Sequence, residues 1–451
     1  MHGGKRKGGI AHIIAVNMGY GHERPANVMR QFASGKSVII ANNYEGIPKH
    51  DRDIWTTNRS WYEKISRFKK VPVAGKVVFG VMDELQRIPE FYPRRDLSGP
   101  SLQLRQSYYM IRHKHLMKHL IESLVDDPKP ILATFPLPAF AAEEFGYPGE
   151  IYCLCTDADI SRAWAPLDPK KTRIQYVAPN GRVVERLKLY GVPAKNIHLT
   201  GFPLPIKNIG HEDKTILKDL QKRLCRLDPN GHFMTHSGEA VAAKVGDTFC
   251  NSVQKKNGHA LQLAFAVGGA GAQREIGSVI AKSLKREIRQ GKVVLHLIAG
   301  TRPEVAQYFR SELKQHGLAP ALKKGQVHIL IEQDRPNYFE AFTDLMRTID
   351  VLWTKPSELS FYTGLGIPII MAPTVGSQEE FNRQWLQQMG AGVDQLDPRY
   401  TNEWLFDWLQ SGALARMAWH GYVEAPTHGA HRIADILEGD GQEYPPHPLV
   451  V

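Results

Sequence analysis

Residues 11–26 read AHIIAVNMGYGHERPA, and this stretch predicts how the chain begins to fold. The apolar run over 11–16 is typical of a buried strand, and a helical pattern begins near Glu23. Gly19 and Gly21 lie between them and favour a tight turn, since glycine adopts backbone conformations that other residues avoid. His22 lies at the mouth of the new helix, whose first N–H groups can meet an anion. The loop is therefore either a substrate site with His22 as a general base, or a plain turn capped by a histidine.

The same alternation of apolar runs and helical patterns continues along the 451 residues. Strands this apolar, separated by helices, favour parallel sheets that are covered on both faces. Two such series predict an α/β protein with two doubly wound, Rossmann-like domains. The expected strands are 11–16, 37–42, 130–134, 150–156 and 173–178 in the first series, and 261–267, 292–300, 326–332, 350–354 and 368–372 in the second. The expected helices are 101–124, 180–190, 211–224, 273–290, 303–316, 335–347 and 378–389, followed by tryptophan-rich helices over 401–438.

The join between the two series falls in a Pro/Gly-rich stretch that begins near residue 203. We expect an N-terminal domain over 1–205 and a C-terminal domain with the last helices over 259–451. Residues 206–258 between them are interpreted as a linker and insertion, with an irregular polar part after the amphipathic 211–224 segment.

Composition narrows the class of partner. The formal net charge is +11, which suits nucleotide phosphates, nucleic acid or an acidic membrane surface. No basic helix or basic run interleaved with aromatic residues is present in the sequence, so nucleic acid is disfavoured. Cys153 and Cys155 look like buried small side chains, and no disulfide framework is evident, which fits a reducing cytoplasm. No window has 18 consecutive apolar residues, so we expect any membrane contact to be peripheral.

Ligands of open α/β sheets bind beyond the carboxyl ends of the strands, so the loops after the strands are the candidate sites. After the strand at 261–267 the sequence reads VGGAGAQ, and Gly268, Gly269 and Gly271 suit a backbone cradle for a diphosphate. The loop is neither a Walker A motif nor a dinucleotide fingerprint. An ordinary glycine-rich turn is the alternative interpretation.

Two further loops of the second series carry polar residues. Lys355 follows the strand at 350–354 and could face a phosphate, while Ser357 and Glu358 lie near a helix start. Glu358 could accept hydrogen bonds from sugar or ribose hydroxyls, or could simply be well placed at a helix N-terminus. Three residues near the helix at 378–389 could also bind sugar hydroxyls, unless they only begin a solvated helix capped by Ser377; they are Gln378, Glu379 and Asn382.

Two other strings carry weaker signals. Asp157 and Asp159 form an Asp-x-Asp after a strand, a pattern that holds a divalent metal in one glycosyltransferase class but is common by chance. Residues 300–304 read GTRPE, a signature of the non-hydrolysing UDP-N-acetylglucosamine 2-epimerases, which there follows the first strand of the chain. Here it falls in the second series, so we interpret Thr301 as an N-cap and Pro303 as an early helical residue.

The order of these loops resembles that of the GT-B glycosyltransferases of the monogalactosyldiacylglycerol synthase group, relatives of the bacterial transferase that adds N-acetylglucosamine to the lipid-linked peptidoglycan precursor. The family opens with a Gly-Gly-Gly-His-x-x-x-Ala loop, in whose place this chain has residues 19–26. Further landmarks follow in the family's order: Thr156-Asp157, Trp164, Tyr176-Val177, Gly191-Val192-Pro193, Ile197, Gly201-Phe202-Pro203, the glycines of 268–271, Thr354-Lys355, Gly366-Ile367-Pro368-Ile369-Ile370, Gln378-Glu379 and Asn382. Tyr20 replaces a glycine, and the family's donor-binding glutamate falls on Phe361, for which Glu358 is the substitute that the sequence offers.

The resemblance implies an inverting transferase that moves a sugar from a nucleotide-sugar, by expectation a UDP-sugar, to a hydroxyl acceptor. His22 or Asp157 would be the catalytic base, with Gly19, Gly21 and Trp164 on the acceptor side. The second domain would bind the nucleotide-sugar, without a metal or other cofactor, because the glycine loop and a lysine can stabilise the leaving diphosphate. Its expected binding residues are Gly268, Gly269, Gly271, Ala272, Lys355, Ser357, Glu358, Gln378, Glu379 and Asn382.

Two alternatives on the same fold stay open. One is a sugar-nucleotide epimerase or hydrolase, and the other is a non-catalytic protein that binds a sugar-nucleotide. A lipid acceptor at an anionic membrane surface fits the basic charge. The expected location is thus the cytoplasm, with peripheral contact at the inner face of the membrane.

Overall fold

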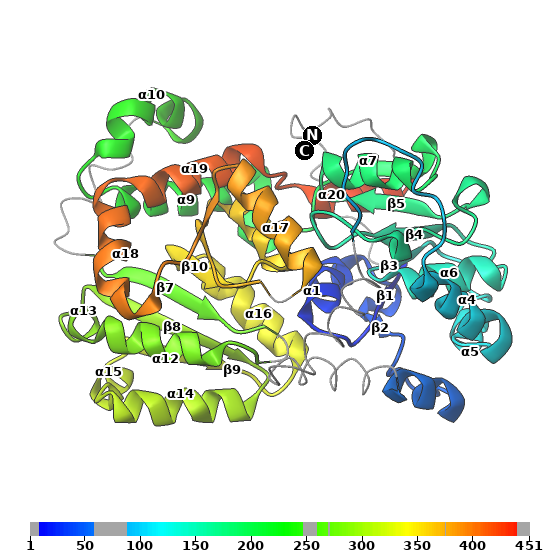
Figure 1. Ribbon diagram of the computed structural model, residues 1–451, viewed down its shortest axis with the longest axis horizontal. Helices are drawn as coiled ribbons and strands as arrows, with labels where there is room; N and C mark the ends of the chain where they lie inside the picture. Colours follow the sequence, from blue (N-terminus) through cyan, green and yellow to red (C-terminus); the bar gives the residue numbers. More distant parts are fainter. Residues whose placement is uncertain (1–8, 58–87, 247–258, 269–270, 375, 440–451) are drawn as a thin grey trace. The chain divides into compact units, whose positions relative to one another are not determined.

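The computed structural model describes residues 9–57, 88–246, 259–268, 271–374 and 376–439. These residues form two compact units, each with a parallel sheet of six strands (Figure 1). The first unit contains the described residues up to Pro203, the segment Gly376–Phe381, and the described residues from His428 onward. The second contains the described residues of Leu204–Val375 and the segment Asn382–Thr427.

The sheet of the first unit has the strand order β2-β1-β3-β4-β5-β6, and all pairs are parallel. Its middle strands are buried on both faces, which explains their unbroken apolar sequences. Its strands are β1 (His12–Ala15), β2 (Ile39–Ile40), β3 (Ile131–Ala133), β4 (Ile151–Leu154), β5 (Gln175–Ala178) and β6 (Ile197–Leu199). Its helices are α1 (Tyr20–Met29), α4 (Leu102–Lys114), α5 (Lys118–Glu122), α6 (Pro136–Glu144), α7 (Gly181–Leu189) and α20 (Gly429–Leu437), with a short 3₁₀ turn η3 (Arg162–Trp164).

The sheet of the second unit has the order β12-β11-β10-β7-β8-β9, again entirely parallel. Its strands are β7 (Leu261–Ala266), β8 (Val293–Gly300), β9 (Val327–Ile331), β10 (Val351–Thr354), β11 (Ile369–Met371) and β12 (Gly392–Asp394). Its helices are α8 (Ile206–Ile209), α9 (Lys214–Leu227), α10 (His232–Val245), α12 (Arg274–Ser283), α13 (Lys285–Arg289), α14 (Pro303–Gln315), α15 (Ala319–Lys323), α16 (Arg335–Met346), α18 (Thr401–Gln410) and α19 (Ala413–Glu424), with the 3₁₀ segments η7 (Glu358–Leu365) and η8 (Pro398–Tyr400). Helix α17 (Ser377–Gln388) is divided between the two groupings at Phe381.

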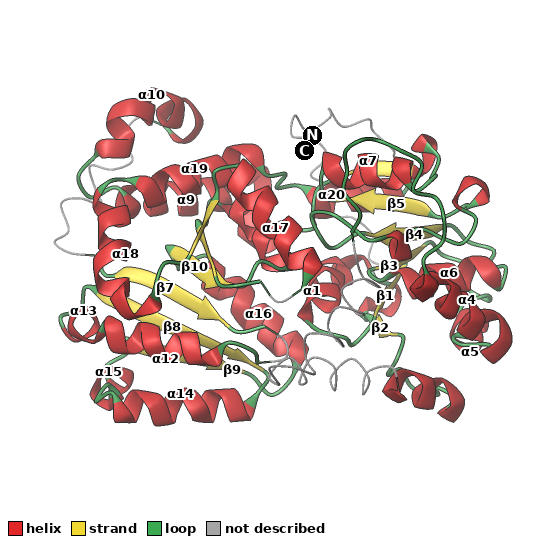
Figure 2. Ribbon diagram, in the orientation of Figure 1, coloured by secondary structure: helices red, strands yellow, loops and turns green. Residues whose placement is uncertain are grey.

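Both sheets reverse their strand order at one point. In the first unit the chain leaves β1 for β2 on one side and later crosses to β3 on the other. In the second unit β7 is followed by β8 and β9 on one side, and β10 is then added on the other. Because parallel crossovers are right-handed, such a reversal places helices on both faces of a sheet, as Figure 2 shows. The predicted α/β architecture of two doubly wound, Rossmann-like units is thus confirmed. The GT-B resemblance also implies that the two units face each other across a cleft, and that arrangement stays a prediction.

The structure differs from the prediction at the sheet edges and in the segment between the two series. Strands β6 and β12 were not predicted; each has only three residues and lies half-buried at an edge. The polar stretch after residue 228 was expected to be irregular, but its described part forms the 14-residue helix α10. Gly231, with a φ of 72°, begins that helix, and Phe233 and Val241 give it a sparse buried face.

The division into units also differs from the expected domains. The segment after Pro203 packs as part of the second unit and not as a linker. The buried Arg223 of α9 explains this, because its guanidinium donates to the carbonyls of Met346, Ile349 and Leu365 at 2.9–3.1 Å. The described residues from His428 onward group with the first unit, where Gly429 abuts the backbone of Phe202.

The cysteines agree with the sequence prediction in part. Cys153 and Cys155 are free and buried, as predicted, but Cys225 is disulfide-bonded, and no disulfide was predicted from the sequence. Thr301 is not the cap of α14, since Arg302 occupies that position, while Pro303 is the first helical residue as expected. In the described parts of the chain, no helix is long and apolar enough to cross a membrane.

Candidate functional site

The carboxyl ends of β1 and β3 bring His22 to the reversal point of the first sheet. Helix α1 begins earlier than predicted, at Tyr20, with Gly19 as its N-cap. Gly19 has a φ of 140°, which L side chains rarely adopt, so the turn depends on this glycine. Gly21 instead lies inside the helix and does not have a positive φ, so the expectation that it shapes the turn was wrong.

Thr134, the residue after β3, holds His22 from two sides. Its carbonyl oxygen lies 2.9 Å from Nδ1 of His22, and its hydroxyl donates to the His22 carbonyl at 2.7 Å. Since a carbonyl can only accept, Nδ1 carries the proton and the neutral ring has its lone pair on Nε2. The hydroxyl of Thr156, which follows β4, lies 3.2 Å from the same Nδ1. This arrangement fixes the tautomer that a general base needs.

Aromatic rings surround the imidazole. Phe135 meets His22 edge-on at a centroid distance of 4.9 Å, and Trp164 lies at 6.1 Å. Trp164 is held in place because its carbonyl accepts a hydrogen bond from the Tyr176 hydroxyl at 2.9 Å. The half-buried His22 therefore combines a fixed orientation with an apolar wall, to which Trp164, one of the expected acceptor-side residues, contributes.

The two aspartates of the Asp-x-Asp pattern have different surroundings. Asp159 is buried and binds Arg186 through both carboxylate oxygens at 2.8 Å, with Arg182 at 2.9 Å. Its charge thus holds α7 to the loop after β4, and it is not available as a metal ligand. Asp157 is half-buried and follows Thr156 directly, which places it one residue from a contact of His22. Both predicted base candidates therefore belong to one neighbourhood of the first unit.

At the reversal point of the second sheet, Gly268 follows β7 and Lys355 follows the neighbouring strand β10. A Cβ atom at Gly268 would lie only 2.6 Å from Cε and 3.4 Å from Nζ of Lys355. The lysine ammonium therefore lies against the backbone of the glycine loop, in space that a side chain would fill. The loop ends with Gly271 and Gln273 at φ values of 70° and 65°, just before α12 begins. An ammonium, a glycine backbone and a helix start come together at the edge of the sheet where ligands bind.

The other predicted residues of the second series are placed as follows. Ser357 caps η7 by accepting from the Leu359 N–H at 3.5 Å, and Glu358 is the buried first residue of that segment. Ala272 is exposed after Gly271, while Gly269 lies outside the described residues. Asn382 is fully buried in the second unit, but the half-buried Gln378 and Glu379 group with the first. The predicted set is therefore not assembled within a single unit.

Phe361, at the family's glutamate position, is a core residue. It is buried in η7 and its ring lies 4.9 Å from that of Trp385 in α17. The position that holds a glutamate in the family is therefore occupied here by a side chain packed in the core. Within the described ranges, no group of three or more histidine, cysteine, aspartate or glutamate side chains is placed to hold a metal ion.

Sequence reasoning missed the residues that position His22. Thr134 and Phe135 belong to the loop after β3, 112 residues from His22. Thr134 ends the apolar run at 130–134 and therefore lies directly after a strand, where the ligand-binding residues of open α/β sheets are expected. Arg302 is a further cation that follows a strand, and the sequence was interpreted there only as the start of a helix. A Cβ atom at Gly271 would lie 3.2 Å from Cδ of Arg302.

Comparisons with known proteins give the following likenesses. A family model described as a domain of unknown function (DUF6938) matches residues 225–411, from α9 to the end of α18. No curated protein matches the sequence. The chain is similar to the solved structure of MurG from Acinetobacter baumannii, with a TM-score of 0.46 and 12% identity over 95% of this chain and 99% of that chain. It is similar to the UDP-GlcNAc 2-epimerase from Neisseria meningitidis bound to UDP-GlcNAc, with a TM-score of 0.42 and 13% identity over 81% and 89%. It is also similar to the lipopolysaccharide outer core galactosyltransferase WaaB, with a TM-score of 0.35 and 13% identity over 74% and 81%.

Proposed function

We propose that the protein is an inverting glycosyltransferase that uses a nucleotide-sugar, by expectation a UDP-sugar, and a hydroxyl acceptor. The observation that carries the proposal is the Lys355 ammonium against the Gly268 backbone at the reversal point of the second sheet. A cation among backbone N–H groups is suited to a diphosphate, whose negative charge grows as the sugar leaves. The order of the sequence motifs supports the same activity.

In the proposed reaction the first unit supplies the base. Nε2 of His22 takes the proton of the acceptor hydroxyl, and the acceptor oxygen attacks the anomeric carbon of the sugar. The bond from that carbon to the diphosphate breaks, and the electron pair leaves with the diphosphate oxygen. Asp157 is the alternative base, and Trp164 and Phe135 give an apolar wall beside the imidazole.

The second unit holds the nucleotide-sugar in this proposal. Lys355 and the N–H groups of the loop after β7 bind the diphosphate, and Glu358 and Asn382 contact the sugar or ribose. Gln378, Glu379, Ser357 and Ala272 remain proposed contributors. A lipid acceptor at an anionic membrane, a cytoplasmic location and the absence of a cofactor also belong to the proposal.

A thermal-shift titration with UDP, UDP-sugars and other nucleotides tests it, because a ligand that binds the folded state raises the melting temperature. We expect a rise with uridine diphosphates that is reduced in Lys355→Met. Lys324→Met, which removes an exposed lysine of the same unit, is the matched control. Absence of any shift at millimolar nucleotide would contradict the proposal.

Product analysis separates the proposal from its rivals. Transfer to an acceptor with inverted anomeric configuration supports the transferase. Release of free sugar or exchange of epimers without an acceptor supports an epimerase or hydrolase. A nucleotide-induced shift without turnover supports a non-catalytic binder, an alternative that the buried Phe361 at the donor-glutamate position favours.

A further inference from the structure

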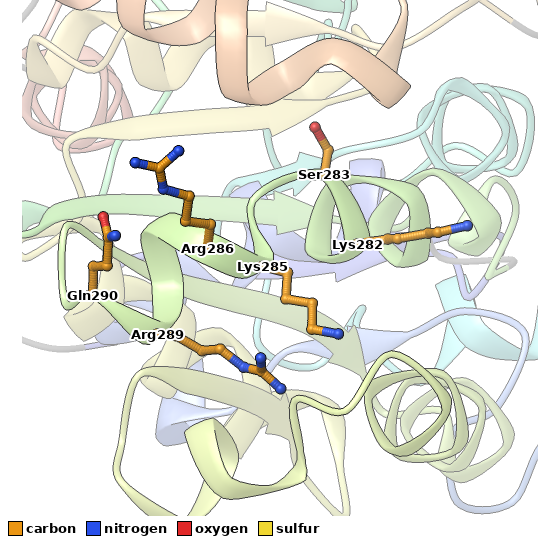
Figure 3. A pocket seen from close by; sticks show the side chains of 6 residues that line it. All are labelled: Lys282, Ser283, Lys285, Arg286, Arg289 and Gln290. Atoms are coloured by element: carbon orange, nitrogen blue, oxygen red, sulfur yellow. The ribbon is translucent and has the colours of Figure 1, made fainter.

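A hollow at the end of α12 carries unusual charge. Figure 3 shows its six lining residues, which come from α12, α13 and the residues that adjoin them, and its volume is about 470 Å³. Four of the six are cationic, and none is acidic. They are Lys282, Ser283, Lys285, Arg286, Arg289 and Gln290.

The four cations have helical spacing across α12 and α13, at 282, 285, 286 and 289, so the expectation that the chain carries no basic helix was wrong for this segment. Cations three and four residues apart repel each other. Elsewhere on α12, Arg274 has the carboxylate of Glu275 at 3.6 Å. None of the four cations in the hollow forms an ion pair with a carboxylate of the described chain, and Glu287 of the same helix does not line the hollow. The hollow thus concentrates positive charge that forms no ion pair with the carboxylates of the described residues.

Two of the cations point to the same side. Lys285 and Arg289 extend in a common direction in Figure 3, and both approach Gly317. Arg289 Nη2 donates to the Gly317 carbonyl at 2.8 Å, and a Cβ atom at Gly317 would lie 3.2 Å from that nitrogen and 3.6 Å from Nζ of Lys285. Gly317, at a φ of 69°, therefore leaves room for an ammonium and a guanidinium side by side.

The positive potential extends to the end of α14. Burial lowers the pKa of the His316 imidazole, Glu312 opposes this, and Lys282 and Lys285 lower it further. Ser283 fixes the other rim, because its hydroxyl donates to Asn402 Oδ1 at 2.9 Å and accepts from the Asn402 N–H at 3.2 Å.

We propose that this hollow is a binding site for a phosphate-bearing polyanion, separate from the site at Gly268 and Lys355. Ammonium and guanidinium groups are the side chains that bind phosphate most strongly. No aromatic ring lines the hollow, so the ligand is held by its phosphate groups and not by a stacked base. Helix α12 starts at the carboxyl end of β7, and α13 leads into the start of β8. The hollow therefore lies near the amino ends of the strands, whereas the proposed donor site lies at their carboxyl ends.

Calorimetric titration with inorganic tripolyphosphate tests the inference, in a Lys355→Met background so that the proposed donor site does not contribute. We expect Lys285→Gln with Arg289→Gln to weaken binding at least about tenfold. The matched control is Lys218→Gln with Lys222→Gln, which removes two exposed lysines at the same spacing from α9 and should change nothing. If the double variant fails to fold, Lys285→Gln alone is used in its place, because this change breaks none of the hydrogen bonds described above.

Sedimentation with phosphatidylglycerol vesicles, against phosphatidylcholine vesicles, distinguishes a lipid headgroup from a free phosphate. If tripolyphosphate binds and this binding depends on Lys285, the ligand is a soluble phosphate compound. If only anionic vesicles bind, and their binding depends on Lys285, the ligand is a lipid headgroup. If neither probe binds, or if both pairs of variants bind equally, the inference is wrong. These readouts do not involve nucleotide-sugar, so the result is independent of the proposed function.

Discussion

The two sheets reverse their strand order in the same way, but they place different chemistry at the two reversal points. In the first unit a histidine is held by the backbone of Thr134 and lies among aromatic rings. In the second, Lys355 lies against a glycine with no side chain between them. A ring with a fixed lone pair suits proton transfer, and a cation beside bare backbone suits phosphate. One topology therefore offers an equivalent place twice, and the residues after the strands decide its chemistry.

The largest expected effect is that of His22→Ala. Removing the base should reduce kcat by about 10²–10⁴-fold and leave nucleotide affinity unchanged, because general base catalysis contributes about that much. Steady-state kinetics measure kcat, and a nucleotide titration measures the affinity for the nucleotide. His113→Ala, at an exposed position of α4, is the control for loss of a histidine. Unchanged kcat in His22→Ala would leave Asp157 as the base and end the assignment of His22.

A second prediction separates structure from chemistry at the first reversal point. Asp159→Ala leaves the buried Arg186 without its carboxylate and should lower the free energy of unfolding by about 3–5 kcal/mol. Asp157→Asn should lower the free energy of unfolding by less than Asp159→Ala does, because Asp157 is only half-buried, while also lowering kcat. Urea unfolding of both variants checks this. Equal destabilisation by the two would show that Asp157 is also structural.

The third prediction concerns the second reversal point. Lys355→Met keeps the length of the side chain but removes its charge, so it should weaken UDP binding by about tenfold to a hundredfold, the usual contribution of a charge-assisted hydrogen bond. Calorimetric titration with UDP measures the change. If His22→Ala weakens UDP binding as much as Lys355→Met does, the proposed division of roles between the units is wrong.

The sequence predicted the strand exits better than the contacts between them. Apolar runs located ten strands. From these followed the strand ends that carry His22 in the first unit, and those that carry Gly268 and Lys355 in the second. It could not show that Thr134 holds His22, because that contact joins loops 112 residues apart and depends on the pairing of β1 with β3. The strands β6 and β12 were not predicted because short, half-buried edge strands have weak apolar patterns.

Buried polar residues show the same limit. Asp157 and Asp159 are equivalent in sequence, and only α7 distinguishes them by presenting Arg182 and Arg186 to the second. Likewise Phe361 could be compared with the family's glutamate in sequence, but its contact with Trp385 shows that the position has become part of the core.

The smallest expected effect is that of Gly268→Ala. The new Cβ would lie 2.6 Å from Cε of Lys355, and because a lysine side chain is flexible, the ammonium should shift and not be lost. We therefore expect UDP binding to weaken only about threefold, less than in Lys355→Met, since the charge stays near the loop. Gly238→Ala in α10 is the matched control, because its Cβ would meet only Met234 Cε at an ordinary 3.6 Å. In a Lys355→Met background the Gly268→Ala change should have almost no further effect, because the two act through the same ammonium. Additive losses in the double variant would mean that the new methyl group obstructs the diphosphate directly, and not only by displacing the lysine.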